Sequence, residues 1–267
     1  MPTSALVFAL AAAGFHALWN LLLARAPDVE AAAAVALIVA EVVFAPLALV
    51  VWHADRGVWP WLVGSGLFEL AYFALLATAY RKAPLSVVYP VARGGAPVIV
   101  LIVGLGTSWG QAAGVLLVVA GILLVRGLRE ANGTGLAYGV AIASCIAGYT
   151  LVDNSGIEHA NPVTYLELSM FAPTLLYAGA VARFKGAAAI RRAVGPATIT
   201  AGIATFVAYG FVLAALSRAS AASVAAVRET SVVVAAALAA VVLKEKVGPA
   251  RVAGAVLVVA GVALVAR

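Results

Sequence analysis

Apolar residues occur in ten long segments along the chain, separated by short clusters of charged, proline and glycine residues. About 20 apolar residues are enough for a helix to cross the hydrocarbon core of a bilayer, and each segment is close to that length. The connections are short, so most neighbouring helices would run antiparallel. The pattern predicts an all-α integral membrane protein with ten transmembrane helices, at residues 4–24, 30–51, 60–80, 84–104, 109–126, 134–153, 161–182, 196–216, 220–243 and 248–266.

The second half of the chain repeats the first half. Residues 113–125 match residues 253–265 at nine of thirteen positions, and the sequence at 44–46 (Phe-Ala-Pro) recurs at 171–173. Five segments per repeat is an odd number, so the second repeat would enter the membrane from the opposite side. The sequence therefore predicts two inverted five-helix repeats in one compact membrane domain, at 1–127 and 128–267. Many secondary transporters have this arrangement, with the solute site between the repeats near the bilayer midplane.

The composition agrees with a membrane protein and argues against other classes. Hydrophobic residues make up 65% of the chain and charged residues 10%, against roughly 45–50% and 25% in soluble domains. The net charge of +6 does not indicate nucleic-acid binding, because most Lys and Arg lie at the ends of apolar segments, where they anchor helices at the membrane edge. Cys145 is the only cysteine, so no disulfide framework is expected, and neither a metal nor another cofactor is predicted.

The distribution of basic residues predicts an orientation. Twelve Lys and Arg residues lie in the connections on one side of the predicted bundle, and three lie on the other side. The positive-inside rule therefore places both termini outside the cytoplasm. The first apolar segment continues to Leu23, which predicts a retained first span rather than a signal peptide.

Residues 89–97 (Tyr-Pro-Val-Ala-Arg-Gly-Gly-Ala-Pro) place a charge inside the fourth apolar segment. A central arginine costs roughly 2.5–3.5 kcal/mol in a bilayer, so a functional reason for Arg93 is expected. Pro90 and Pro97 each lack a backbone donor and free a carbonyl one turn earlier, which predicts unwinding of the fourth helix, and of that helix only. Arg228 is the approximate repeat counterpart of Arg93, without the prolines. The two arginines together predict a two-sided central site.

Further polar residues within the apolar segments are candidates for the same site. For the arginines, the alternative to solute contact is a structural ion pair; for the carboxyl groups, the alternative to proton transfer is a permanent hydrogen bond between helices; for the histidine and the aromatic residues, it is packing. The predicted substrate-binding residues are Arg93, Arg228, Tyr89, Tyr72, Trp19, Asn20 and Tyr209. The predicted proton-coupling residues are Glu69, Glu41, His16 and Glu229.

Several motifs are characteristic of one known family. They are Tyr89-Pro90 with Arg93 and Pro97, Arg228-Glu229-Thr230-Ser231, Leu243-Lys244-Glu245, Gly254 with Gly261, and His16-Ala17-Leu18-Trp19-Asn20. In these motifs, and over essentially the whole chain, the sequence resembles the drug/metabolite transporter superfamily, specifically its EamA-like ten-helix members. It departs from that family in lacking the acidic residue before the fifth segment, and its charge distribution opposes the family's cytoplasmic termini.

The resemblance implies efflux or exchange of small metabolites, often amino acids or drugs, driven by a proton gradient or by solute exchange. It also implies a multi-pass protein of the cell membrane, with the bacterial inner membrane as the expected location. The two arginines favour a solute with a carboxylate or phosphate. A solute channel is the first alternative and an intramembrane enzyme the second, although the chain has no HExxH or GxSxG pattern. The expected partners are a small-molecule solute and the lipid bilayer, with the chain as a monomer or homodimer.

Overall fold

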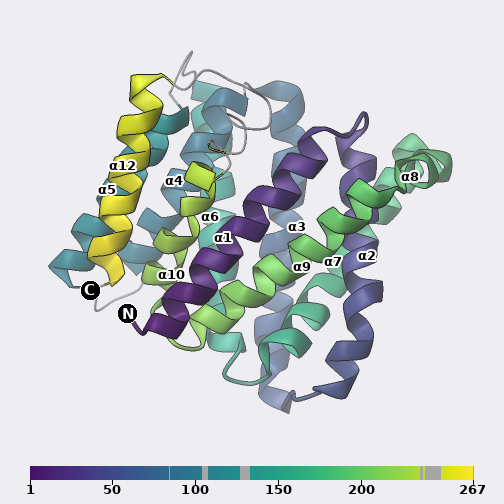
Figure 1. Ribbon diagram of the computed structural model, residues 1–267. Helices are drawn as coiled ribbons and strands as arrows, with labels where there is room; N and C mark the ends of the chain where they lie inside the picture. The colour runs from purple at the N-terminus through teal and green to yellow at the C-terminus, as the bar shows by residue number, and fades with distance from the viewer. Residues whose placement is uncertain (84, 104–107, 127–132, 235–236, 238–247, 267) are drawn as a thin grey trace.

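The protein is helical throughout the part that the computed structural model describes, which is residues 1–267 except 84, 104–107, 127–132, 235–236, 238–247 and 267 (Figure 1). An isolated β-bridge joins Ala54 to Ala160. The helices are α1 (Thr3–Ala24), α2 (Val29–Val50), η1 (Arg56–Val58), α3 (Trp59–Lys82), α4 (Leu85–Val103), α5 (Trp109–Arg126), α6 (Gly133–Gly156), α7 (Pro162–Lys185), α8 (Ala187–Ala193), α9 (Pro196–Leu216), α10 (Ala221–Arg228) and α12 (Pro249–Ala266).

Seven helices within the described residues are long and apolar enough to cross a membrane, and they belong to α1, α2, α3, α6, α7, α9 and α12. Val87–Val103 of α4 and Trp109–Val125 of α5 are shorter apolar helices. The predicted all-α membrane class is therefore confirmed. Two details differ from the prediction: the ninth segment is interrupted after α10, and α8 forms in a connection where no helix was expected. The count of ten spans stays a prediction.

At one end of the bundle, the connection between α1 and α2 is tied to the end of α7. Asp28 accepts a hydrogen bond from the Ala31 N–H at 3.1 Å, which caps α2. Lys185 Nζ lies 2.7 Å from Asp28 Oδ1 and 2.6 Å from Glu30 Oε2. The hydrogen bond from Lys185 holds the pKa of Asp28 below its usual value. These contacts join the first half of the chain to the second half.

At the opposite end, the connection between α2 and α3 binds the connection between α6 and α7. The Asp55 N–H donates to the His159 carbonyl oxygen at 2.9 Å, and the His159 ring nitrogen Nδ1 lies 3.1 Å from Asp55 Oδ1. Hydrogen bonds from His159 and from the Gly57 N–H hold the pKa of Asp55 below its usual value. Asn161 caps α7 and also donates to the Val51 carbonyl oxygen. The two halves are therefore joined at this end as well.

Helices α5 and α12 pack side by side at very short range (Figure 1). A Cβ atom added at Gly121 would lie 2.6 Å from the Gly254 carbonyl oxygen, and one added at Gly114 would lie 2.7 Å from the Gly261 carbonyl oxygen. Missing side chains at these positions let the two backbones approach closely. Residue numbers rise along one helix as they fall along the other, so the pair is antiparallel.

We expect Gly121→Ala to destabilise the protein, because the added methyl group meets the α12 backbone, and overpacking of this kind costs about 1–3 kcal/mol. Gly14→Ala in α1 is the matched control, since a Cβ there meets nothing within 4 Å. Thermal unfolding of the purified protein in detergent should give a lower Tm for Gly121→Ala and an unchanged or higher Tm for Gly14→Ala. Equal melting temperatures would contradict the close packing of α5 on α12.

Candidate functional site

The ninth apolar segment is interrupted next to a pair of charged residues. Helix α10 ends at Arg228, Glu229 forms a turn, and residues 230–234 are helical again. The Thr230 hydroxyl donates to the Val227 carbonyl oxygen at 2.8 Å, a local bond of the kind that competes with helical pairing. The predicted unwinding of the fourth helix is wrong, because α4 runs without a break through both of its prolines. The interruption lies instead in the segment that has no proline.

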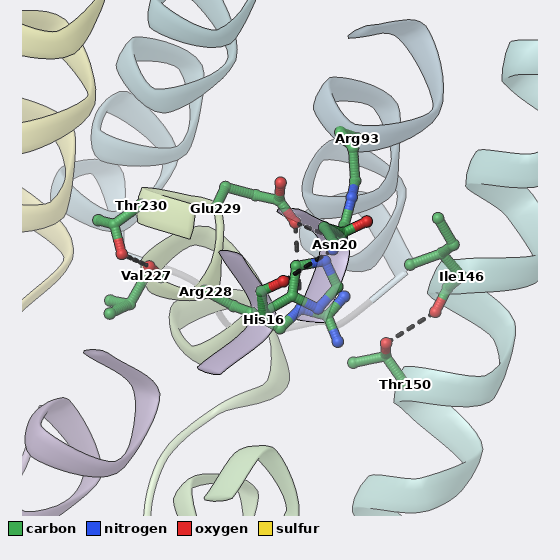
Figure 2. A network of polar contacts seen from close by, with 9 residues as sticks. All are labelled: His16, Asn20, Arg93, Ile146, Thr150, Val227, Arg228, Glu229 and Thr230. Carbon is green, nitrogen blue, oxygen red and sulfur yellow. Dashed lines mark hydrogen bonds and ion pairs between the residues drawn. The ribbon is translucent and has the colours of Figure 1, made fainter. Parts of the chain in front are cut away.

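Two arginines and one glutamate form a buried ionic cluster at this interruption (Figure 2). Glu229 Oε1 lies 3.4 Å from Arg93 Nη1 and 4.0 Å from Arg228 Nε. The exposed fraction is 8% for Arg93, 4% for Arg228 and 0% for Glu229. One carboxylate thus faces two guanidinium groups. With all three ionised, the cluster has a surplus of one positive charge, which a negatively charged ligand would neutralise.

The backbone around Arg228 and Glu229 stabilises the charges of these two side chains. Arg228 lies in the last turn of α10, and Glu229 lies directly before the helical residues 230–234. Helix C-termini stabilise cations and helix N-termini stabilise anions, by about 0.3–1 kcal/mol each at exposed sites. On α4, Pro97 has no N–H, so the Arg93 carbonyl cannot receive its usual helical hydrogen bond. Both helices therefore bring polar backbone groups, as well as charged side chains, to the centre.

Helix α1 adds three polar or aromatic side chains beside the cluster, as Figure 2 shows for two of them. The His16 ring packs edge-on against Trp19, with ring centroids 4.9 Å apart, and both arginines act on His16 electrostatically. His16 Nε2 is buried and makes no hydrogen bond with the described residues. The Asn20 amide donates to the His16 carbonyl oxygen at 2.8 Å. His16 therefore presents an unused polar atom next to two guanidinium groups.

A central cavity brings most of the predicted site residues together. The volume of this cavity is about 160 Å³, which is enough for several water molecules or a small polar ligand. The predicted residues that line it are His16, Trp19, Glu41, Glu69, Tyr72, Arg93, Tyr209 and Arg228. Tyr89 and Asn20 line an adjoining pocket that also includes Arg93. Glu229 lines neither and contacts the arginines instead.

Aromatic rings cover part of the cavity wall. Tyr149 of α6 lies edge-on to Tyr72 of α3 and to Tyr209 of α9, with ring centroids 6.4 Å and 6.0 Å apart. The Arg93 guanidinium carbon lies 5.7 Å from the centre of the Tyr89 ring, which is a cation–π distance. The sequence prediction included Tyr72, Tyr89 and Tyr209 but missed Tyr149, because no feature of its segment distinguishes a cavity-facing tyrosine from a packed one.

Asp153 is the main polar residue that the sequence prediction missed. It is fully buried and accepts hydrogen bonds from the Tyr165 hydroxyl at 2.9 Å and from the Tyr209 hydroxyl. The predicted sixth segment ended at Asp153, whereas α6 continues to Gly156, and this places the aspartate inside the helix. A Cβ at Gly156 would overlap the Tyr165 ring, so glycine permits this contact. Asp153 joins α6 to α7 and α9 at one end of the cavity.

The two ends of the cavity differ. The adjoining pocket extends to Ala24, Val29 and Glu30, of which Ala24 and Val29 are exposed, at the end of the bundle that carries Lys185. Towards the other end lie the buried hydrogen bonds of Asp153 and then the contact between Asp55 and the connection after α6. The adjoining pocket therefore extends the cavity towards the first end, whereas hydrogen bonds and an ion pair join the helices towards the second end.

We expect Glu229→Gln to destabilise the protein strongly, because it leaves two buried guanidinium groups without their counter-charge. Removing one partner of a buried ion pair costs about 3–5 kcal/mol. Lys185→Gln breaks two exposed ion pairs, each worth about 0–1 kcal/mol, and is the matched control. Thermal unfolding in detergent should show a large fall in Tm for Glu229→Gln alone. Similar Tm values for the two variants would show that Glu229 does not balance the arginines.

Comparison with known proteins places the chain in a family. One solved structure, titled only as the crystal structure of a protein, has the same fold, with a TM-score of 0.79 and 20% sequence identity over 99% of this chain and 96% of that chain. No curated protein sequence matches the chain. A sequence model described as the EamA-like transporter family matches residues 133–267. This match covers half of the chain, and it confirms the resemblance seen in the sequence motifs: the chain belongs to the EamA-like transporter family.

Proposed function

We propose that this membrane transporter moves a small negatively charged or zwitterionic metabolite by alternating access. The observation that supports this most directly is the buried cluster of two arginines and one glutamate, whose arginines line the central cavity. Discontinuous helices of this kind carry solute sites in many secondary transporters. The solute classes that fit are amino acids, organic anions and drug-like molecules with an acidic group, and the transport modes are efflux and exchange.

The charge of the cluster supports an anionic group on the solute. Glu229 neutralises one of the two guanidinium groups, so a carboxylate or phosphate could neutralise the other. Guanidinium binds both groups through two parallel hydrogen bonds. Arg228 Nε makes no hydrogen bond with the described residues, and the nearby His16 Nε2 also has none. Arg93, Arg228 and the surrounding aromatic residues Tyr72, Tyr89, Tyr209 and Trp19, with Asn20, form the proposed solute-binding set.

Contacts between helices support two inverted repeats of five helices, at 1–127 and 128–267. With the offset of 140 seen in the sequence, Gly114 corresponds to Gly254 and Gly121 corresponds to Gly261. Exchanging the two repeats therefore turns the close contact between Gly114 and Gly261 into the close contact between Gly254 and Gly121, and both contacts are present. Likewise, α1 packs on α9 and α3 packs on α6, and these pairs are repeat equivalents. Such pseudo-symmetry provides two equivalent closures, one for each side of the membrane.

The asymmetry of the cavity supports one state of this cycle. The end towards which the adjoining pocket extends carries basic residues that include Arg25, Lys82 and Lys185, whereas the other end carries Arg56 and Arg218. If the positive-inside rule holds, the conformation is open to the cytoplasm and the termini lie outside. We propose the bacterial inner membrane as its location, with the chain acting as a monomer or homodimer.

Proton coupling is part of the proposal. Glu69 and Glu41 are both buried and line the cavity, so protonation of either could respond to a solute. Glu69 has Arg228 and Asp153 as electrostatic neighbours, while Glu41 has the Glu167 carboxyl. His16 is a further candidate, whereas Glu229 is engaged by both arginines. A solute channel would lack this coupling.

The test combines ligand screening with counterflow. Amino acids, organic acids, sugar phosphates and cationic drugs are screened by thermal shift, and we expect acidic compounds to raise the Tm, because a ligand stabilises the state that it binds. Proteoliposomes loaded with such a compound should then accumulate the labelled compound against its gradient. A channel would show equilibration without this trans-stimulation, and that result would overturn the proposal.

Arg228→Lys tests the role of the guanidinium group. The lysine keeps the charge but loses the paired hydrogen bonds, each worth about 1.5–3 kcal/mol at a charged group. We expect the apparent KM for the acidic solute to rise about tenfold or more. Arg218→Lys, on an exposed residue, is the control. An unchanged KM in Arg228→Lys would place the solute elsewhere.

A further inference from the structure

Helix α2 packs on α7, and this contact brings Glu41 of α2 near Glu167 and Thr174 of α7. The Glu167 carboxyl and the Thr174 hydroxyl are the polar neighbours of the Glu41 carboxyl. Glu167 and Thr174 are seven residues apart, which places them on one face of α7 two turns from each other. Met170 lies between them in the sequence and lines the central cavity, as does Glu41. Three oxygen-bearing side chains therefore converge at the contact between α2 and α7.

Each of these side chains has a buried oxygen without a hydrogen bond to any described residue. The atoms are Glu41 Oε2, Glu167 Oε2 and Thr174 Oγ1. The exposed fraction is 9% for Glu41 and 3% for Thr174. An unpaired buried polar atom costs about 1–3 kcal/mol, and a charged one costs more. The cluster has one hydroxyl donor for two carboxyl groups, so it lacks a donor or a cation.

The charge of the pair is not balanced by an ion pair. None of the salt bridges among the described residues involves Glu41 or Glu167. The titratable groups of the other cavity-lining elements are His16 (α1), Glu69 and Tyr72 (α3), Arg93 (α4), Tyr149 (α6), Tyr209 (α9) and Arg228 (α10). On α8, which packs against both helices, Arg191 and Arg192 are exposed. Two neighbouring carboxyl groups in a medium of low dielectric constant cannot both ionise without such a partner.

We propose that Glu41 and Glu167 share one proton, and that this pair, with Thr174 as a hydrogen-bond donor, is the proton-binding site of the transporter. One group is then a carboxylic acid that donates to the other, which is a carboxylate. When a conformational change separates the two carboxyl groups, the proton passes to water in the cavity, and the pair changes from one negative charge to two. This inference rests on the proposed transport function, and it adds Glu167 and Thr174 to the residues that carry it out.

The position of the pair links the proton to the conformational change. Glu41 belongs to the first half of the chain and Glu167 to the second half. A movement of one half against the other changes the distance between the carboxyl groups, and with it their affinity for the shared proton. By reciprocity, protonation favours the conformation in which the carboxyl groups are close. The same cavity contains Arg93 and Arg228, so the proton and an acidic solute would act on one another electrostatically.

Infrared spectroscopy of the purified protein tests the shared proton directly. At neutral pH, Glu41→Gln, Glu167→Gln and the double variant should each remove the same part of the carbonyl stretch of protonated carboxyl groups. Equal losses are expected because the two residues hold one proton between them. Glu158→Gln, on an exposed residue, is the control and should leave the band unchanged. A larger loss in the double variant than in either single variant would overturn the shared proton.

Transport measurements test the coupling. In proteoliposomes, the ratio of solute uptake with a pH gradient to uptake without one should fall to unity in Glu167→Gln. Thr174→Val should weaken the gradient response and Thr174→Ser should restore it. A response that persists in Glu167→Gln, or that is lost in Glu69→Gln alone, would overturn the assignment. A response of transport to a sodium gradient would also overturn the assignment to a proton, if sodium chloride removes the infrared band and choline chloride does not.

The two proposals fail in different ways. If wild-type counterflow is absent, the transport function is wrong, and the infrared result still decides whether the pair holds a proton. If counterflow is present and the pH gradient has no effect on the wild type, the transport function stands and the coupling site is wrong.

Discussion

The carboxylate of Glu229 allows two arginines to occupy the centre of a membrane protein. Isolated guanidinium groups are costly there, and a buried ion pair is stable only when its geometry and remaining hydrogen bonds compensate for the lost hydration. Here one carboxylate contacts a guanidinium from α4 and another from its own segment. The compensation is incomplete, because positive charge remains in surplus. In the proposed function this surplus favours an anion in the cavity, and an acidic solute would complete the balance that Glu229 begins.

The same constraint explains why the ninth segment is interrupted and the fourth is not. Adjacent residues on a continuous helix point in different directions, so Arg228 and Glu229 could not easily meet within one helix. The turn at Glu229 brings Oε1 of Glu229 to within 4.0 Å of Arg228 Nε. In α4, Pro90 and Pro97 stay within a regular helix, since a helix in a bundle can accommodate the lost hydrogen bonds. The sequence shows where backbone donors are missing, but not which helix has to bend to satisfy a charge.

Periodicity and segment length were enough to predict the helices, because the bilayer requires about 20 apolar residues per span and permits few alternatives. The unusual position of two arginines within apolar segments was enough to predict that Arg93 and Arg228 lie close together at the centre of the protein. The partners of these groups were harder to predict, because they depend on contacts between distant segments. Asp153 lay at the end of a predicted segment and became interior only because α6 extends to Gly156. Glu167 lies within the predicted segment 161–182, but its position near Glu41 depends on how α2 packs on α7.

In the proposed mechanism the polar groups serve two functions, solute binding and proton binding, next to one cavity. The arginine cluster lies where α4 meets the interrupted segment, and Glu41 with Glu167 lies where α2 meets α7, so both bridge the first and second halves of the chain. Contacts within one half would be unaffected by a movement between halves, whereas these contacts would change. A solute that neutralises the arginines and a proton that neutralises a carboxyl pair would therefore act on the same equilibrium between conformations. Coupling between them then needs no direct contact, because each ligand favours the conformation that holds its own groups together.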